Sequence, residues 1–295
     1  MFNTESKIMR WARQTRFERL AWSLRRLHCP VDSNALVLEV GSGGNPYPRS
    51  NVLLDAYETT RERHWVPLRI DRPMVLGYVE NLPFRDGAFD FVIASHVLEH
   101  SSNPERFLSE LQRVARAGYI EVPDAFMERI NPYRDHRLEV TIRDMRLVIR
   151  KKSAWQSNPE IVELYEHHAK ALIAHKLIPA NPFAFHVRYY WESQIAFSVV
   201  NPEVDADWAV PKDHEQAPAA SSTPGWRGTL MNVLRTTLSQ SRRNKNIELA
   251  GLLSCPNCRG SIRVENPSSI DCENCHSKFP LKNGVPAMYA MNSGR

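Results

Sequence analysis

An acidic residue and a glycine-rich turn lie near the start of this chain. The apolar segment 37–40, which contains Glu39, is followed by Gly41-Ser42-Gly43, and a second apolar run ends at Asp55. Glycines in such a turn let a ligand approach the backbone without a Cβ in the way. Ligands of open α/β sheets bind beyond the carboxyl ends of the strands, where Asp55 could accept hydrogen bonds from a ribose diol. The spacing predicts a site for a nucleoside-containing cofactor.

The same turn disfavours two common nucleotide sites. A dinucleotide fingerprint requires a third glycine three residues after Gly43, and that position is Pro46. A phosphate-binding P-loop requires Gly-Lys-Ser/Thr after the turn, and none is present. What remains is the pattern of an acidic residue followed by Gly-x-Gly.

Further motifs follow in order along the chain. They are Asn81-Leu82-Pro83-Phe84 and the run from Asp86 to His100, which contains Asp-Gly-Ala-Phe-Asp and Val-Leu-Glu-His. With the glycine turn, this set resembles the class I S-adenosylmethionine-dependent methyltransferases over residues 35–123. The resemblance implies an α/β protein with a Rossmann-like, doubly wound, mainly parallel sheet, and S-adenosylmethionine as its cofactor.

The resemblance also implies roles for individual residues. The turn would lie against the methionine portion, Glu39 would organise its amino group, and Asp55 would bind the ribose. The cofactor-binding candidates are Glu39, Gly41, Ser42, Gly43, Asp55, Tyr78, Val79, Asn81, Leu82 and Ser95. Alternatively, Glu39 and Asp55 only cap strand ends at a solvated rim. Tyr78 replaces the acidic residue usual for adenine, and the two prolines of segment 45–51 predict a turn instead of the first crossover helix.

His96, expected under the sulfonium at the end of the fourth strand, is the candidate catalytic base, although local hydrogen bonding explains it equally well. His100, His136 and His186 are weaker candidates. No Asn/Asp-Pro-Pro-Tyr follows the fourth strand, and no cysteine lies near its end. We therefore expect methyl transfer to an O or N atom of a small-molecule, lipid or glycan acceptor. RNA methylation is the alternative, and a non-catalytic, cofactor-binding scaffold or partner subunit is a third interpretation.

Four cysteines form a second motif near the C-terminus. Cys255 and Cys258 make one Cys-x-x-Cys pair, and Cys272 and Cys275 make another after thirteen intervening residues. This spacing is typical of a closed, tetrahedral structural zinc site; disulfides are the alternative. With Phe279 to Pro286, the region is similar to the small zinc-ribbon activators of tRNA and protein methyltransferases. That similarity implies a stabilising or substrate-positioning role, with contacts to its own methyltransferase domain or to a partner protein.

Composition and charge complete the predicted organisation. Residues 1–30 hold seven Lys or Arg against two Glu, which accounts for the whole formal net charge of +5. They predict a basic amphipathic helix that covers the sheet edge or binds an anionic surface, RNA or membrane lipid. With neither a signal segment nor an apolar run of about 20 residues, we expect a cytoplasmic protein. The predicted parts are 1–30 (basic helix), 31–201 (methyltransferase domain), 202–225 (flexible linker), 226–247 (basic helix) and 248–295 (zinc ribbon).

The acceptor side is expected within 124–200. An insertion at 124–185 should contain a helix over 161–177, which has helix-face apolar spacing. Segments 186–191 and 195–200 predict a closing antiparallel hairpin.

Overall fold

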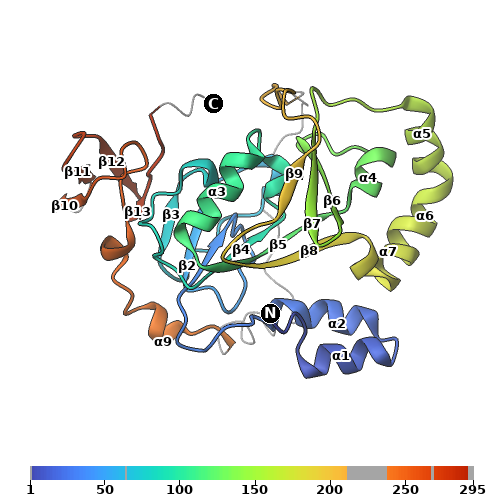
Figure 1. Cartoon of the computed structure of the whole chain (residues 1–295), viewed down its shortest axis with the longest axis horizontal. Coiled ribbons are helices and arrows are strands. Elements are labelled where there is room, and N and C mark those ends of the chain that lie inside the picture. The colour runs from blue at the N-terminus through green and yellow to red at the C-terminus, as the bar shows by residue number, and fades with distance from the viewer. Residues whose placement is uncertain (1, 64, 211–237, 267–268, 292–295) are drawn as a thin grey trace. The chain divides into compact units, whose positions relative to one another are not determined.

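The computed structural model describes residues 2–63, 65–210, 238–266 and 269–291. Its main sheet has six strands in the order β3-β2-β1-β4-β5-β8 (Figure 1). These strands are β1 (Val37–Val40), β2 (Val52–Asp55), β3 (Met74–Leu76), β4 (Phe91–Ser95), β5 (Ala117–Pro123) and β8 (His186–Glu192). The order reverses after β1, as in doubly wound sheets.

Strands β1, β2 and β3 pair in parallel, with Leu38 opposite Val52 and Leu53 opposite Met74. All of their residues are buried, because a parallel sheet buries both faces and selects continuous apolar runs. Segment 45–51 contains only turns and bends, as its prolines predict. Helix α3 (Pro104–Val114) connects β4 and β5. The predicted α/β class with a mainly parallel, Rossmann-like sheet is confirmed.

The chain divides into two compact units, which we describe in turn. One comprises Val31–Ile93, Arg106–Gly118 and Glu215–Arg295; the other comprises Met1–Pro30, Ala94–Glu105 and Tyr119–His214. The C-terminal residues therefore belong to the same unit as β1 to β3. The domain boundaries expected from the sequence stay a prediction.

An extra four-stranded sheet, which contains the cysteines, lies in the first of these units. Its strands are β10 (Ile262–Asn266), β11 (Ser269–Cys272), β12 (Lys278–Lys282) and β13 (Val285–Pro286), in that order. Ala287 forms a parallel bridge with Leu76, and the Met288 N–H donates to the Leu76 carbonyl at 2.8 Å. Val285 and Ala287 share a buried apolar cluster with Leu53. The segment after β13 thus extends the edge of the main sheet.

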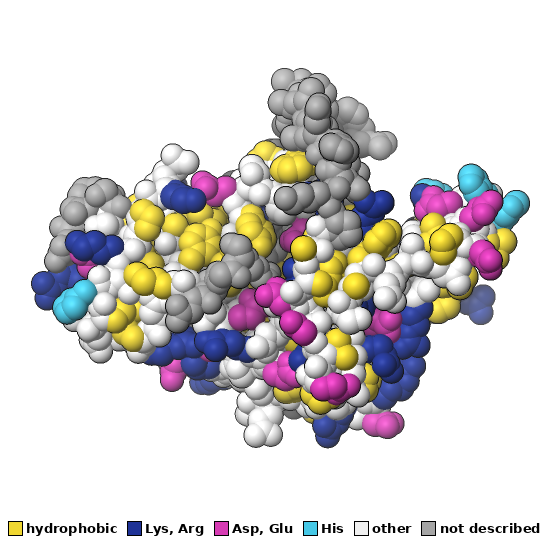
Figure 2. Space-filling model, turned by 90° about the horizontal axis from the view of Figure 1, so that it is seen from above, with side chains coloured by type: hydrophobic (Ala, Val, Ile, Leu, Met, Phe, Trp, Pro, Cys, Tyr) yellow, Lys and Arg dark blue, Asp and Glu magenta, His cyan; other side chains and the backbone are white. Residues whose placement is uncertain are grey.

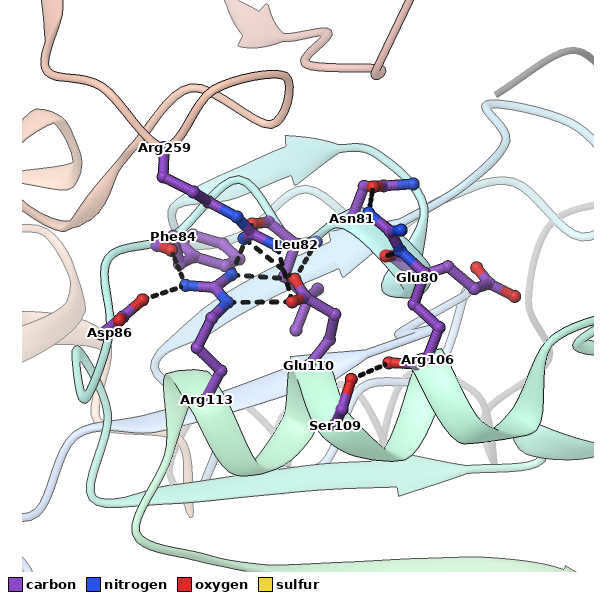
Figure 3. Close-up of polar contacts among 10 residues, drawn as sticks. All are labelled: Glu80, Asn81, Leu82, Phe84, Asp86, Arg106, Ser109, Glu110, Arg113 and Arg259. Atoms are coloured by element: carbon purple, nitrogen blue, oxygen red, sulfur yellow. Dashed lines mark hydrogen bonds and ion pairs between the residues drawn. The ribbon is translucent and has the colours of Figure 1, made fainter. Parts of the chain in front are cut away.

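A buried carboxylate on α3 also anchors this extra sheet (Figure 3). Glu110 accepts hydrogen bonds from Arg113 on its own helix and from Arg259, next to the first cysteine pair. Burial alone would raise the pKa of Glu110, but the two guanidinium groups outweigh it and hold the pKa below its ordinary value.

Replacement of Arg259 with alanine should therefore weaken the attachment of the extra sheet. Because Arg113 remains on Glu110 and Arg259 is 35% exposed, we expect a loss of about 1–2 kcal/mol in the free energy of unfolding, measured by urea denaturation. The control is Arg263→Ala, which breaks an exposed pair with Glu273 and should cost less than about 0.5 kcal/mol. Equal losses in the two variants would contradict the anchoring role.

In the second unit, residues 1–30 form two helices instead of the one predicted. They are α1 (Lys7–Gln14) and α2 (Glu18–Leu24), and a short 3₁₀ turn, Arg25–Leu27, follows. The break lies at Arg16, whose left-handed φ of 63° ends the helical path. The Thr15 hydroxyl also competes for helix carbonyls, since it donates to the Trp11 and Ala12 oxygens.

The predicted hairpin over 186–200 is wrong. Strand β8 joins the main sheet, whereas β9 (Phe197–Val199) pairs in parallel with β7 (Arg146–Lys151) in a separate three-stranded sheet. Ser193, with φ 62°, turns the chain between them. The third strand of the small sheet, β6 (Leu138–Arg143), pairs with β7 in an antiparallel hairpin. Along β6 the apolar Leu138, Val140 and Ile142 alternate with polar residues, a signal for a strand that the sequence analysis missed.

The helix predicted at 161–177 is present in a modified form. It runs through α5 (Pro159–Leu164), α6 (Lys170–Leu172) and α7 (Ile178–Ala180), and five-residue π-helical stretches separate them. The wider π turns break the 3.6-residue period, so Leu164 and Leu172 remain about 60% exposed. Figure 2 shows apolar, acidic and histidine side chains exposed on this segment, at the right of the view.

The remaining described helices are short. Helix α4 (Ala125–Ile130) lies in the second unit, and α9 (Ser241–Asn244) is the described part of the predicted basic helix. Most of the predicted linker and the start of that helix fall at 211–237, outside the described residues. Among the helices that the structure describes, none has the length and apolar character needed to cross a bilayer.

Candidate functional site

The predicted glycine turn follows β1 as expected. Gly41 and Gly43 have φ values of 66° and 56°, a region that strongly favours glycine. The buried Glu39 carboxylate accepts a hydrogen bond from the Tyr47 N–H at 2.8 Å. Ser42 is also buried, and its Oγ has no hydrogen-bond partner within the described ranges. An orphaned hydroxyl in this turn is what a site for a polar ligand would leave.

Asp55, the last residue of β2, faces the same turn. The Gly43 N–H donates to its Oδ2 at 2.9 Å, and the Tyr57 N–H donates to its Oδ1 at 3.1 Å. Arg63, which the sequence analysis missed, donates to Oδ1 at 3.1 Å. A carboxylate offers about four acceptor positions. A ribose diol could therefore use Oδ2 directly and would compete with Arg63 for the rest.

The loop around Arg63 also covers the turn. The Arg69 N–H donates to the Gly43 carbonyl at 3.2 Å. A Cβ added to Gly44 would lie 2.5 Å from Val66 Cγ1, so this glycine is required by the loop itself. No residue between 60 and 70 had been a candidate, because the contact depends on the path of the loop.

Three tyrosines gather beyond β2 and β3. The ring of Tyr78 lies 6.0 Å from that of Tyr57 and 5.3 Å from that of Tyr289. Tyr289 follows β13, and its hydroxyl donates to the Ala56 carbonyl at 2.9 Å. Burial, followed by nearby tyrosines and carboxylates, raises the pKa of Tyr289 to about 12, so it remains a neutral donor. Aromatic faces here could stack on a nucleobase, and the sequence did not indicate Tyr289.

The other adenine-side candidates are near Tyr78 in sequence but are engaged within the protein. Val79 and Leu82 are buried, and the Leu82 N–H donates to Glu110 at 2.9 Å. The Asn81 side-chain oxygen accepts a hydrogen bond from Arg106 (Figure 3). These contacts fix the 3₁₀ turn Val79–Asn81 on α3.

Ser95 and His96 end β4 in the second unit. His96 has a left-handed φ of 58°, an uncommon conformation for a non-glycine residue that often marks a functional site. Its N–H donates to the Glu121 carbonyl at 2.7 Å, and the Ser95 hydroxyl donates to the Glu121 carboxylate at 3.3 Å. The imidazole lies between two carboxylates, with Glu99 3.4 Å from Nδ1 and Glu121 3.4 Å from Nε2.

These carboxylates change the expected state of His96. Burial lowers its pKa, but the neighbouring carboxylates of Glu121 and Glu99 outweigh that effect and raise it to about 9. The ring is 42% exposed, so solvent screens part of this attraction. A protonated imidazole donates rather than accepts a proton, which argues against the general-base role that we predicted.

The sequence analysis missed Glu121, the fully buried centre of this group. Arg25 forms a bidentate pair with it, with Nε 2.7 Å from Oε2 and Nη2 2.8 Å from Oε1. Tyr119 donates a further hydrogen bond. Burial would raise the pKa of Glu121, but Arg25 and His96 hold it far below its ordinary value of 4.5.

The Arg25–Glu121 pair makes stability depend on pH. A carboxylate whose pKa is depressed in the folded state contributes stability that is fully present above its unfolded value, here 4.5, and is lost as pH falls below it. Arg25→Ala should cost about 3 kcal/mol in the free energy of unfolding at pH 7, and stability should then fall less steeply in acid. Chemical denaturation at several pH values measures both.

Arg10→Ala is the control, since the exposed Arg10 side chain donates a hydrogen bond to the exposed Asn3, and the effect should stay within about 0.5 kcal/mol. An unchanged acid slope in Arg25→Ala would show that Glu121 does not titrate with folding.

The four C-terminal cysteines converge as predicted. Their sulfur atoms all lie within 4.8 Å of one another, with Cys255 3.6 Å from Cys275 and Cys258 3.5 Å from Cys272. All four are free thiols, and disulfide sulfurs would lie about 2.05 Å apart. Zn–S bonds of about 2.3 Å give tetrahedral edges of about 3.8 Å. The geometry is compatible with zinc binding.

Three comparisons with known proteins give the family context. Residues 49–120 match the model of a family described as a methyltransferase domain. An uncharacterized protein of Methanocaldococcus jannaschii is 27% identical over 81 residues, 28% of this chain and 40% of that protein. Ajmaline N-methyltransferase of Rauvolfia serpentina is 42% identical over 43 residues, 15% of each chain. The chain thus spans less than half of the length of these curated relatives.

Solved structures give similar matches. A SAM-dependent methyltransferase of Thermotoga maritima shares 22% identity over 40% of this chain and 57% of its own, with a TM-score of 0.29. A complex that contains the Haloferax volcanii Trm112 methyltransferase activator has a TM-score of 0.37 and 16% identity, over 65% of this chain and 98% of that chain. Scores below 0.5 do not by themselves establish a relationship. The family match and the sheet order together indicate a methyltransferase-type domain.

Proposed function

We propose that the chain is an S-adenosylmethionine-dependent methyltransferase that transfers a methyl group to an O or N atom of a small-molecule, lipid or glycan acceptor. The observation that carries the proposal is the pairing of the glycine turn with Asp55 inside the family-matched fold. The Gly43 N–H already holds the Asp55 carboxylate, which is the arrangement needed to present it to a ribose.

The residues present fit this cofactor. The turn and the orphaned Ser42 hydroxyl would receive its amino-acid portion, and Asp55 its ribose after Arg63 is displaced. Tyr78 and Tyr289 would flank its base. The bound cofactor supplies an activated methyl group on a sulfonium, so the protein needs mainly to position the acceptor and exclude water.

On the acceptor side we retain His96 as the candidate, in a positioning role. Its ring is held by Glu99 and Glu121, and it is 42% exposed, so it can still meet an acceptor. RNA is the alternative acceptor. The rings of Trp11 and Phe17 stack at 6.3 Å and are both more than half exposed on the arginine-rich α1–α2 surface, which suits an anionic partner, either RNA or membrane lipid. Transfer of labelled methyl groups to total RNA, abolished by ribonuclease, would distinguish RNA from the other acceptors.

Cofactor binding tests the proposal first. Titration calorimetry should show that the wild type binds S-adenosylmethionine and that Asp55→Ala binds at least tenfold more weakly, because hydrogen bonds to a charged acceptor contribute about 1.5–3 kcal/mol each. The matched control is Asp86→Ala, whose side chain is 79% exposed, and its affinity should be unchanged. A folded wild type that binds no cofactor would overturn the proposal. Binding without transfer to any acceptor would favour the non-catalytic scaffold.

We also propose that Cys255, Cys258, Cys272 and Cys275 hold a structural zinc ion. Four thiolates close the coordination shell, so this ion would stabilise the extra sheet and take no part in chemistry. Because Tyr289 follows that sheet, its position depends on the ribbon fold. The ribbon would thereby support the nucleoside end of the cofactor site.

Removal of the zinc should therefore weaken cofactor binding. After chelation we expect about a tenfold loss of affinity by titration calorimetry, restored by added zinc, which corresponds to about 1.4 kcal/mol. Tyr289→Ala leaves every cysteine in place and should reproduce the loss, whereas Met291→Ala, at an exposed position, should not. Unchanged cofactor affinity in the zinc-free protein would show that the ribbon does not support the cofactor site.

A further inference from the structure

A second group of metal-binding side chains lies in the unit that holds His96. Glu99, His100 and His136 place one ligand atom each within 4.8 Å of one another. Glu99 and His100 belong to the turn after β4, and His136 precedes β6. The Arg137 N–H donates to the Glu99 carbonyl at 2.7 Å, which fixes these two segments against each other.

Both imidazoles are held by a hydrogen bond at Nδ1. His136 Nδ1 lies 2.5 Å from the Glu128 carboxylate, whose second oxygen accepts from Lys152 at 3.0 Å. His100 Nδ1 lies 3.1 Å from the Asp135 carbonyl. Metal-binding histidines characteristically donate their other ring N–H to a carboxylate or a carbonyl, which fixes the tautomer and turns Nε2 toward the ion. In this tautomer Nε2 carries the lone pair that can coordinate a metal ion.

The Glu99 carboxylate provides an independent observation. Its side chain is 3% exposed, and neither oxygen has a hydrogen-bond partner among the residues that the structure describes. His96 Nδ1 lies 3.4 Å from one of these oxygens. Burial of an ionised carboxylate without hydrogen bonds is expensive, so such groups are normally paired or bound to metal. A cation between Glu99 and the two imidazoles would satisfy it.

We propose that Glu99, His100 and His136 bind a divalent transition-metal ion, with zinc, manganese, iron(II) and cobalt as the class. Two nitrogen ligands disfavour magnesium and calcium, which prefer oxygen. Three protein ligands leave positions open for water or for an oxygen atom of an acceptor, in contrast to the closed shell of the four cysteines. The inference does not depend on the proposed methyl transfer.

Cobalt titration of the full-length protein tests the site without any variant. The chain is first loaded with one zinc ion, which the four thiolates retain because they are the softer ligands. Added cobalt(II) should then bind with a ratio of one per chain and produce d–d absorption without the sulfur-to-cobalt charge-transfer band of a thiolate site. Metal analysis by plasma mass spectrometry should find one zinc and one cobalt.

Variants then assign the ligands. His136→Ala and Glu99→Gln should each lower cobalt affinity at least tenfold, and His168→Ala, an exposed histidine on the π-helical segment, should leave it unchanged. Zinc retained by the cysteines and an unchanged circular dichroism spectrum would show that the variants are folded. Wild-type protein that takes up no cobalt, zinc or manganese beyond the first ion would overturn the proposal. So would a charge-transfer band that places the cobalt on sulfur.

Discussion

A carboxylate that is removed from water must be paired with a cation or with hydrogen-bond donors. In each unit of the protein this requirement fixes where particular arginine-bearing segments lie. Three buried carboxylates are each held by one or two arginines from another part of the chain or from the next helical turn. The pairs are Glu121 with Arg25, Glu110 with Arg113 and Arg259, and Asp55 with Arg63. An unpaired charge at any of these positions would cost several kcal/mol, a large share of the stability of an ordinary domain. The folded chain therefore has little freedom in where these arginine-bearing segments lie.

The same pairing explains how short segments become part of a larger structure. Helices α1 and α2 are short and are separated by a left-handed residue. They therefore gain order from the pairing of Arg25, just after α2, with Glu121 on β5, rather than from their own length. The cysteine-bearing sheet is also too small to bury a sufficient core. It gains Glu110 as an anchor and the edge of β3 as a pairing strand. This attachment is what brings Tyr289 next to Tyr78.

Features that depend on local pattern could be predicted from the sequence. The parallel strands, the glycine turn, Asp55 at the end of β2 and the convergence of the cysteines all follow from short motifs with a direct physical meaning. The missed features depend on tertiary contacts. Arg63, Glu121 and Tyr289 carry no motif, and each matters only through a contact that the folded chain makes: with Asp55, with Arg25 and with Ala56, respectively. The wrong prediction of a hairpin at 186–200 has the same origin, because β8 pairs with β5 and β9 pairs with β7.

Glu99 differs from these three carboxylates, and the difference is the basis for the proposed metal site. The sequence shows it only as part of Val-Leu-Glu-His, where an acidic residue before a helix-like turn has an ordinary capping role. In the structure it is buried as deeply as Glu110 and yet accepts no hydrogen bond from the part of the chain that the structure describes. The residues that face it are imidazoles already oriented by their own acceptors. Glu121, Glu110 and Asp55 are each paired with an arginine, whereas two imidazoles lie beside Glu99. A metal ion bound by Glu99, His100 and His136 would pair this carboxylate as well.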